Sequence, residues 1–359
     1  MLSPFNELLE LSGATATTMV AGVDTHKDFH VVAVLNVRGS VVSTAAFAAT
    51  TSGYAQLLDH VTAHGFLARI GVESTSAYGA GLTRFLIDAG MDVIDVPTTD
   101  KAIRARRGKT DVDDASAAAR YVLGGAGHAP KNSTGIVESI RMLVLVRSQA
   151  VKNRTAALNQ IAALVVTAPA DLQAQLRGCT NPRIAKTAAT FRPDRTRLDE
   201  PLQAAKVALK RLGERVRRLD TEIADANVDL DLLVASAAPS LLALHGVGTH
   251  HAAQLLLTAA QNIDRISSPA AFTRLCGAAP IPVSSGRSHR MRLHRGGDRQ
   301  ANRALHMIVI CRLKTETRSR AFMARKLSEG HSRRDAIRAL KRYVARETFN
   351  ALKTDLSRL

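Results

Sequence analysis

The sequence predicts an α/β domain with a mixed sheet, followed by a charged helical middle and a basic helical C-terminal domain. Short Val-rich runs with the spacing of strands come first, and helical stripes then alternate with further strands. After residue 133 the apolar positions follow helical spacing over long stretches. A chain of 359 residues is long enough for two domains and a connector. The expected parts are an extension at 1–18, the α/β domain at 19–133, the helical segment at 134–235 and the C-terminal domain at 236–359.

The elements of the α/β domain follow from its local patterns. Strands are expected at residues 19–24, 29–37, 41–47, 68–73 and 91–96, and helices at residues 53–64, 77–90 and 111–123. Short links join the first three strands, which is typical of an antiparallel meander, and the later strands alternate with helices. This order is the one expected of a ribonuclease-H-like fold, a mixed sheet with helices on its faces.

The rest of the chain is expected to be almost entirely helical. Near-heptad apolar spacing and dense charge in residues 134–235 indicate an antiparallel helical hairpin or a coiled coil between subunits. A solvated helical spacer is the alternative, and the pattern alone leaves both open. In the C-terminal domain, loops are expected at residues 244–248, 284–299 and 328–333.

Composition and charge narrow the functional class. Hydrophobic residues make up 46% of the chain, which excludes wholesale disorder. The sequence has no apolar run long enough for a membrane span and no basic region typical of a secretory signal. Its three cysteines are far apart, which argues against disulfides or a Cys-based zinc site and predicts a cytoplasmic, nucleoid-associated protein. The net charge of +18, concentrated in residues 236–359, predicts a polyanionic partner.

Four carboxylates occupy positions that a metal-dependent enzyme requires. Asp24 and Glu73 end two predicted strands, and strand ends are where a sheet assembles a site from distant parts of a chain. Asp111 and Asp114 stand three residues apart at a helix start, so both can point the same way, whereas Asp113 should project elsewhere. Clustered carboxylates repel one another unless cations lie between them, and their hard oxygens favour Mg²⁺ or Mn²⁺. Turn formation and helix capping are the alternative roles.

Several motifs resemble those of a known family. The segments GVDTHKD (22–28), VESTSAY (72–78) and KTDVDDA (109–115) resemble the DEDD transposases of the Piv/MooV type, insertion-sequence family one-ten. The catalytic domain of this family is similar to that of RuvC resolvases. The resemblance continues to about residue 350 through LLALHGVGTHHAAQLL (241–256), FTRLCGAAPIPVSSGRSHRMR (272–292) and NRALHMIVI (302–310).

The resemblance implies a DNA transposase or site-specific recombinase guided by a non-coding bridge RNA, which pairs with target and donor DNA. Asp24, Glu73, Asp111 and Asp114 carry over as its metal-binding tetrad. Ser285 carries over as a nucleophile that becomes joined to DNA, because the family reads S-G-x-S where this chain has Ser285-Gly286-Arg287-Ser288. Ser284, directly before it, keeps the assignment open by one residue.

Two features of the C-terminal domain are candidates for nucleic-acid binding. Gly246 and Gly248 lie in a segment similar to the hairpin of helix-hairpin-helix domains, where backbone N–H groups face a phosphate. A helix–helix corner that needs a glycine is the alternative. The second feature is a set of arginines expected to contact phosphates, or else to form a solvated basic face: Arg287, Arg290, Arg292, Arg295, Arg299 and Arg303.

Recombination is therefore the expected function, and strand exchange between two duplexes predicts a dimer that assembles into a tetramer. A RuvC-like, structure-specific (Holliday junction) endonuclease without a covalent intermediate is the alternative. Two weaker readings are a non-enzymatic nucleic-acid scaffold and a tyrosine recombinase using Tyr343. The absence of Trp and the 4% aromatic content argue against extended base-stacking platforms.

Overall fold

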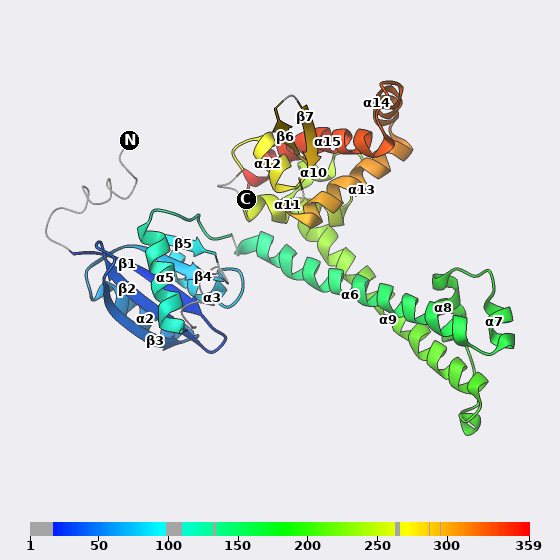
Figure 1. Ribbon diagram of the computed structural model, residues 1–359. Helices are drawn as coiled ribbons and strands as arrows, with labels where there is room; N and C mark the ends of the chain where they lie inside the picture. Colours follow the sequence, from blue (N-terminus) through cyan, green and yellow to red (C-terminus); the bar gives the residue numbers. More distant parts are fainter. Residues whose placement is uncertain (1–16, 98–109, 132–133, 263–265, 287, 295) are drawn as a thin grey trace. The chain divides into compact units, whose positions relative to one another are not determined.

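The computed structural model describes residues 17–97, 110–131, 134–262, 266–286, 288–294 and 296–359. They divide into two compact units (Figure 1). The first is drawn from Met1–Thr134 and Ala260–Arg265, and the second from Gly135–Ala259 and Ile266–Leu359. Apart from its last two residues, the extension expected at 1–18 lies outside the described residues.

The first unit is built on the mixed sheet that the sequence predicts. Its five strands lie in the order β3-β2-β1-β4-β5. Strand β1 runs antiparallel to β2 and parallel to β4, β2 runs antiparallel to β3, and β4 runs parallel to β5. Their bounds are β1 Thr18–Thr25, β2 Phe29–Asn36, β3 Val41–Ala48, β4 Phe66–Glu73 and β5 Val93–Val96. The carboxyl ends of the parallel strands β1, β4 and β5 therefore meet at one edge of the sheet.

Helices cover both faces of this sheet. Helices α2 (Thr51–Thr62) and α3 (Ala80–Asp88) pack on one face, where Leu57, Leu82 and Leu86 are fully buried against β1, β2 and β4. Helix α5 (Asp111–Leu123) packs on the other face. Its sheet-facing side is made of small residues, chiefly Ala115, Ala118 and Ala119, so that its backbone can approach the strands closely.

Gly22 of β1 sets the distance between α5 and the sheet. A Cβ atom at this position would lie 2.1 Å from the backbone N of Ala119 and 2.4 Å from the carbonyl O of Ala115. Since these contacts are with backbone atoms, no side-chain rotation can relieve them. The helix can rest on β1 only because this residue has no side chain.

Substituting Gly22→Ala is therefore expected to push α5 away from β1. Overpacking of this kind costs about 1–3 kcal/mol. Hydrogen exchange should show loss of protection in α5 and β1 while the second unit keeps its protection. Gly124→Ala at the end of the same helix is the control, because its Cβ would meet only ordinary contacts at 3.5 Å or more. Equal protection in the Gly22 and Gly124 variants would contradict this account.

The second unit begins with two long antiparallel helices, α6 (Gly135–Thr167) and α9 (Pro201–Ala237) (Figure 1). Polar contacts fix their register: Arg147 Nε donates to Asn227 Oδ1 at 2.5 Å, and Arg154 pairs with Asp220. This pair is the antiparallel helical hairpin that the sequence allowed. Heptad packing between subunits stays a prediction.

A separate core closes the far end of this helix pair. Helices α7 (Ala170–Leu176) and α8 (Asn181–Ala189) pack there against α6 and α9, with the short 3-10 helix η1 (Arg195–Arg197) in the return path (Figure 1). Leu172, Ile161 and Leu209 are fully buried in this core. No helix among the described residues is both long and apolar enough to cross a membrane.

Among the residues that the structure describes, six further helices and a β-hairpin complete the second unit. The helices are α10 Pro239–Leu242, α11 Thr249–Ala260, α12 Pro269–Leu275, α13 Arg299–Thr315, α14 Thr317–Ser328 and α15 Arg333–Leu356. Helix α15 contacts α10, α12, α13 and α14. The buried carboxylate of Asp355 near its end accepts hydrogen bonds from the backbone N–H groups of Ser240 and Leu241, each at 3.0 Å. These bonds fix the start of α10 against the last turn of α15.

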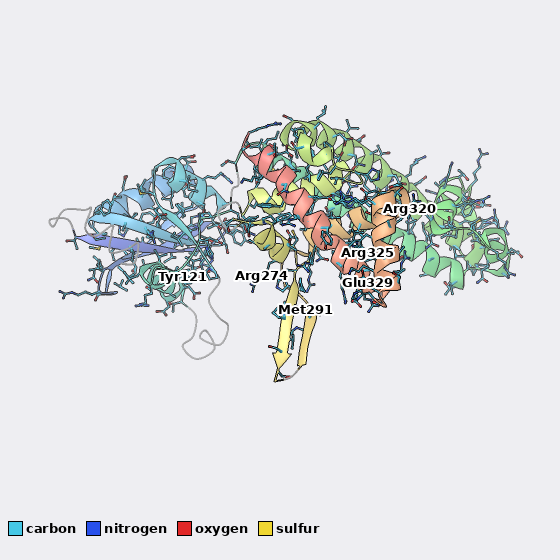
Figure 2. All side chains as sticks on the ribbon, turned by 90° about the horizontal axis from the view of Figure 1, so that it is seen from above. Tyr121, Arg274, Met291, Arg320, Arg325 and Glu329 are labelled. Carbon is cyan, nitrogen blue, oxygen red and sulfur yellow. The ribbon has the colours of Figure 1, made fainter. Side chains whose placement is uncertain are left out.

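The hairpin corrects one expectation. The segment from residue 284 was expected to be a loop, but strands β6 (Pro280–Ser285) and β7 (Ser288–Leu293) pair antiparallel and project away from the helices (Figure 2). The prolines Pro280 and Pro282 argue against a strand in the interior of a sheet. A two-stranded sheet has only edge strands, where proline is tolerated.

A pH dependence of stability follows from His250 on α11. Burial, with Arg147, His251 and Arg303 nearby, lowers its pKa from 6.5 to about 4. The unfolded chain therefore binds more protons than the folded chain between these values, and stability falls as the pH is lowered through this window.

Allowing for residual solvent screening, we expect the wild type to lose about 1–2 kcal/mol more than His250→Gln between pH 7 and about pH 4.5. Gln keeps a neutral polar side chain that does not titrate. Thermal unfolding of both proteins across this range is the measurement, and parallel pH profiles would contradict the assignment.

Candidate metal centre

Asp24 and Glu73 lie next to each other on adjacent parallel strands and face α5. Gly22 of β1 is in register with Gly71 of β4, and both abut α5. Because strand side chains alternate, the residues two positions further on point to the same face of the sheet. Those residues are Asp24 and Glu73, which are only 6% and 4% exposed. The strand alternation that buries Val23 and Val72 on one face thus aims these carboxylates at the other.

Helix α5 brings the second pair of carboxylates. It begins at Asp111, one turn before the Ala115 that rests on Gly22, so its first turn lies over the carboxyl ends of the strands. Asp114 is 5% exposed, on the sheet-facing side of the helix, while Asp111 is partly exposed.

Asp113 points away from this pair, as predicted. It is exposed, and its carboxylate accepts a hydrogen bond from Thr110 Oγ1 at 2.7 Å while its own N–H donates to the same oxygen at 3.1 Å. These two bonds cap the helix and fix its first residue. Thr110 and Asp113 therefore cap the N-terminus of α5.

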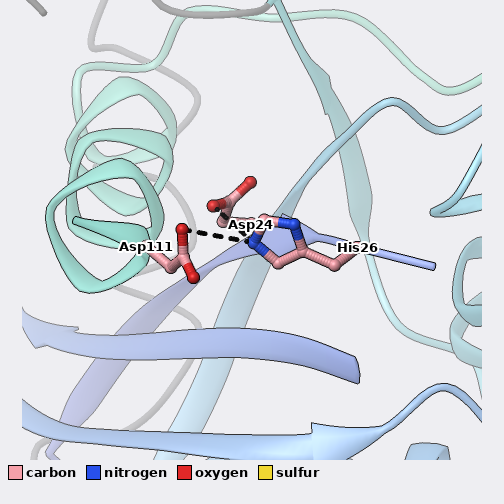
Figure 3. Close-up of side chains that lie close together, drawn as sticks. All are labelled: Asp24, His26 and Asp111. Atoms are coloured by element: carbon pink, nitrogen blue, oxygen red, sulfur yellow. Dashed lines mark ion pairs between the residues drawn. The ribbon is translucent and has the colours of Figure 1, made fainter. Parts of the chain in front are cut away.

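Asp24 and Asp111 converge on His26, at the end of β1 (Figure 3). His26 Nε2 lies 3.2 Å from Asp24 Oδ2 and 3.4 Å from Asp111 Oδ1. One potential ligand atom from each of the three residues lies within 4.8 Å of the others. This spacing suits donor atoms around a single divalent cation, since oxygen ligands lie about 2.0–2.6 Å from Mg²⁺ or Ca²⁺.

Hydrogen bonds behind the carboxylates hold the strand ends. Thr25 Oγ1 donates to the carbonyl oxygen of Glu73 at 3.1 Å and so ties the end of β1 to the end of β4. Thr75 Oγ1 donates to Asp95 Oδ1 at 2.6 Å and ties the loop after β4 to β5. Between them Ser74 has a φ of 51°, a left-handed conformation that is costly for a residue other than glycine. The chain thus turns sharply at the residue after Glu73.

The donor set fits a divalent cation. Carboxylate oxygens are the ligands that Mg²⁺ and Mn²⁺ prefer. Asp24, Asp111 and the nearby Glu73 and Asp114 would supply oxygens, and His26 a nitrogen. The acidic cluster is therefore compatible with a bound metal.

His26 is a member of this cluster that the sequence did not predict. Its signal was the spacing Asp24-x-His26 at a strand end, which points both side chains to the same face of the sheet. A histidine two residues from a carboxylate is common in sequences. His26 stands out only in the folded chain, where α5 brings Asp111 close to both His26 and Asp24.

The other predicted site residues lie in the second unit. Ser285 is the last residue of β6, is exposed, and pairs in register with Ser288 across the turn at Gly286, whose φ is 54°. Arg292, Arg299 and Arg303 are exposed at the surface, as phosphate contacts or a solvated face would require. Arg287 and Arg295 lie outside the described residues, and of Arg290 only the backbone, paired with Val283, is described.

The glycines of the Leu244–Gly248 segment lie at a corner between α10 and α11. Gly246 has a φ of 78°, which favours glycine. Arg312, 4% exposed, donates from Nε to the carbonyl of His245 at 2.8 Å and pairs with Glu347 of α15. This geometry is what a helix–helix corner requires, and a phosphate contact at Gly246 and Gly248 stays a prediction.

Comparison with known proteins places both units of the chain in one family. Residues 21–168 match a family model for the DEDD transposases of the IS110 type, and residues 238–324 match the model of the transposase IS116/IS110/IS902 family. An insertion element IS900 uncharacterized 42 kDa protein of Mycobacterium paratuberculosis is 29% identical over 153 residues. That match covers 42% of this chain and 37% of that protein.

The two models match different parts of one chain, in the order in which its motifs occur. The chain belongs to the IS110 family of insertion-sequence transposases, as the resemblance of its motifs implied.

Proposed function

We propose that the protein is a DNA transposase or site-specific recombinase that cleaves and exchanges DNA strands with Asp24, Glu73, Asp111 and Asp114. The observation that carries this proposal is the convergence of Asp24 and Asp111 on His26 at the strand ends, with buried Glu73 on the neighbouring strand. The strand order β3-β2-β1-β4-β5 supports assigning the first unit to the ribonuclease-H-like folds of RuvC type.

The metal in this proposal is Mg²⁺ or Mn²⁺. Bound by these carboxylates, such a metal would supply charge stabilisation for an in-line displacement at phosphorus. The chain's own contribution is to hold the carboxylates at fixed positions. The Gly22 contact sets the height of α5 above β1, and the Thr25 hydroxyl ties β1 to β4.

Ser285 acts as the nucleophile in this proposal. Its Oγ forms an ester bond to the scissile phosphorus, one bridging P–O bond breaks, and the hydroxyl proton ends on the oxygen of the released strand. A serine hydroxyl needs activation, and the proposed source is the metal that the carboxylates would hold. Exposure at the end of a two-stranded hairpin supports delivery of Ser285 to a phosphate.

A bridge RNA and other protomers complete the assembly. The net charge of +18 supports binding of RNA together with donor and target DNA at the nucleoid. Exposed apolar side chains with helical spacing on α6 and α9 support helix-mediated formation of a dimer that pairs into a tetramer: Met142, Leu145, Val146, Val228 and Leu232.

Strand transfer in vitro tests the proposal. Purified protein, donor and target DNA and the transcript of the DNA flanking the gene should give recombined product only with Mg²⁺ or Mn²⁺. Omission of the RNA should abolish the product, and mass photometry should detect dimers and tetramers. Metal-dependent nicking of branched DNA without joined product would favour the structure-specific endonuclease instead. No cleavage with any metal would overturn the proposal.

A further inference from the structure

A groove crosses α15 beside the base of the hairpin. Its first hollow, of about 480 Å³, is lined by Met291 and Arg292 of the hairpin, Lys326 of α14, and Lys341 and Arg342 of α15, among others. A second hollow of about 630 Å³ adjoins the first. The two share four lining residues: Ala279, Lys326, Ala339 and Arg342. Because they share these residues, the two hollows lie side by side, and we treat them together as one groove, whose length suits an extended chain better than a compact ligand.

Positive charge dominates the first hollow. Its lining contains one carboxylate, that of Asp335, against five basic side chains: Arg292, Lys326, Arg338, Lys341 and Arg342. Arg338 pairs with Asp335 at 2.8 Å, and Lys326 pairs with Glu329. Within the described part of the chain, no ion pair neutralises the other three cations, which is the arrangement expected of an anion site.

Lys341 is the buried cation of this hollow. Its side chain is 8% exposed, and its Nζ donates to Asn302 Oδ1 at 2.6 Å. Asn302 is held in turn, since its Nδ2 donates to the carbonyls of Cys276 and Gly277 at 2.8 and 2.9 Å. Burial lowers the pKa of Lys341, because the ammonium has lost water without gaining a carboxylate. An ammonium has three donors, so phosphate oxygens can complete its surroundings.

The second hollow offers an aromatic surface. Tyr343 lines it and is 52% exposed, so much of its ring faces the hollow or solvent. Its ring meets the ring of Phe322 edge to face at 5.4 Å, and the guanidinium of Arg325 lies 5.4 Å from the Phe322 ring centre. Phe322 thus holds Tyr343 in place, and the exposed part of the Tyr343 ring can stack on a base. Arg346 adds a further cation to the same hollow.

We infer that this groove binds one strand of nucleic acid, with Lys341 and Arg342 on neighbouring phosphates and Tyr343 stacked on a base. Met291, 70% exposed at the edge of the first hollow, offers an apolar contact for a sugar or base (Figure 2). The inference rests on the proposed function, because it names a binding site for its nucleic-acid substrate or guide. It also gives Tyr343 a role other than that of a recombinase nucleophile. Single-stranded DNA and RNA share the chemistry that the groove recognises.

Fluorescence anisotropy tests the groove. Labelled 12-nucleotide DNA and RNA strands and a duplex are titrated with the full chain in EDTA over a series of salt concentrations. Lys341→Met should weaken binding of a single strand about fivefold and lower the salt slope by about 0.7, the value for one phosphate contact. Tyr343→Ala should weaken binding about tenfold and leave the salt slope unchanged.

The control is Lys353→Met, which removes the same charge from the same helix. Lys353 is exposed and lies twelve residues beyond Lys341, about 18 Å along α15. It should change affinity less than about twofold. Should Lys341→Met fail to fold by thermal melting, Arg342→Gln and Tyr343→Ala, both at exposed positions, provide the test.

Three outcomes would overturn the inference. The variants could keep the affinity and salt slope of the wild type, they could lose no more affinity than the control, or they could lose affinity for duplex DNA alone. A loss greater with RNA assigns the groove to the guide, and a loss greater with DNA assigns it to a substrate strand; both support it. Because no divalent ion is present, binding is independent of cleavage. Failure of strand transfer with an intact groove would overturn only the proposed function.

Discussion

If Asp24 holds the proposed metal, Asp24→Asn is expected to reduce DNA cleavage at least about 10³-fold while the protein remains folded, because a neutral amide of the same shape replaces one charged oxygen ligand. Asp24 is buried beside His26 and Asp111, so its charge cannot be replaced by solvent. Cleavage of labelled donor DNA over a series of Mg²⁺ and Mn²⁺ concentrations measures the effect.

A second readout separates metal binding from general damage. Without metal, Asp24→Asn should still unfold in one cooperative transition, because the amide keeps the shape of the carboxylate. With metal, the wild type should gain stability by mass action and the variant should gain much less. Asp113→Asn is the control: it removes an exposed carboxylate from the same helical turn as Asp111, and cleavage should change less than about threefold. Equal cleavage by the Asp24 and Asp113 variants would refute a metal role for Asp24.

Ser285→Ala is expected to eliminate the covalent protein–DNA species and to lower strand transfer at least about 10³-fold, because in the proposed reaction Ser285 forms the ester. DNA affinity and metal-induced stabilisation should stay within about twofold of the wild type, since Ser285 lies in the second unit and contributes no metal-site carboxylate. Denaturing gels of protein with labelled DNA detect the adduct directly.

Ser284→Ala is the matched control, one residue earlier on the same strand. Neighbouring strand residues point to opposite faces, so the two hydroxyls cannot occupy the same position in a site. An adduct that persists in Ser285→Ala and is lost in Ser284→Ala would move the nucleophile by one residue. Full nicking activity without any adduct in both variants would favour the endonuclease reading.

Much of the first unit could be predicted from sequence because its signals are local. Every predicted strand and helix of this unit is present, with most bounds shifted by no more than two or three residues. The strand-end positions of Asp24 and Glu73 follow from the same patterns. The close approach at Gly22 could not be predicted, because it depends on which helix returns to cover β1, and no local pattern specifies that partner.

In the second unit, fewer features could be predicted from local sequence patterns. The long helices were predicted from their periodicity, but the hairpin was not, because prolines and arginines obscure the alternation of a strand that has a single neighbour. The groove beside it could not be predicted either, because no single segment of the sequence forms it. It brings together Arg292, Lys326 and Lys341, which lie on three elements separated along the chain. Sequence alone could show an excess of charge but not that Lys341 is buried.

The helix pair α6 and α9 has a consequence for how this family can diversify. The chain enters and leaves the pair at the same end, and the far end is closed by α7 and α8 around a core of its own. With 33 residues, α6 extends about 50 Å. Whole helical turns can therefore be inserted or deleted in matched pairs without moving the residues at the root. The length of the pair can therefore differ between members of the family. The distance from the α7–α8 end to the end where the chain enters and leaves the pair would change, and the catalytic residues would stay the same.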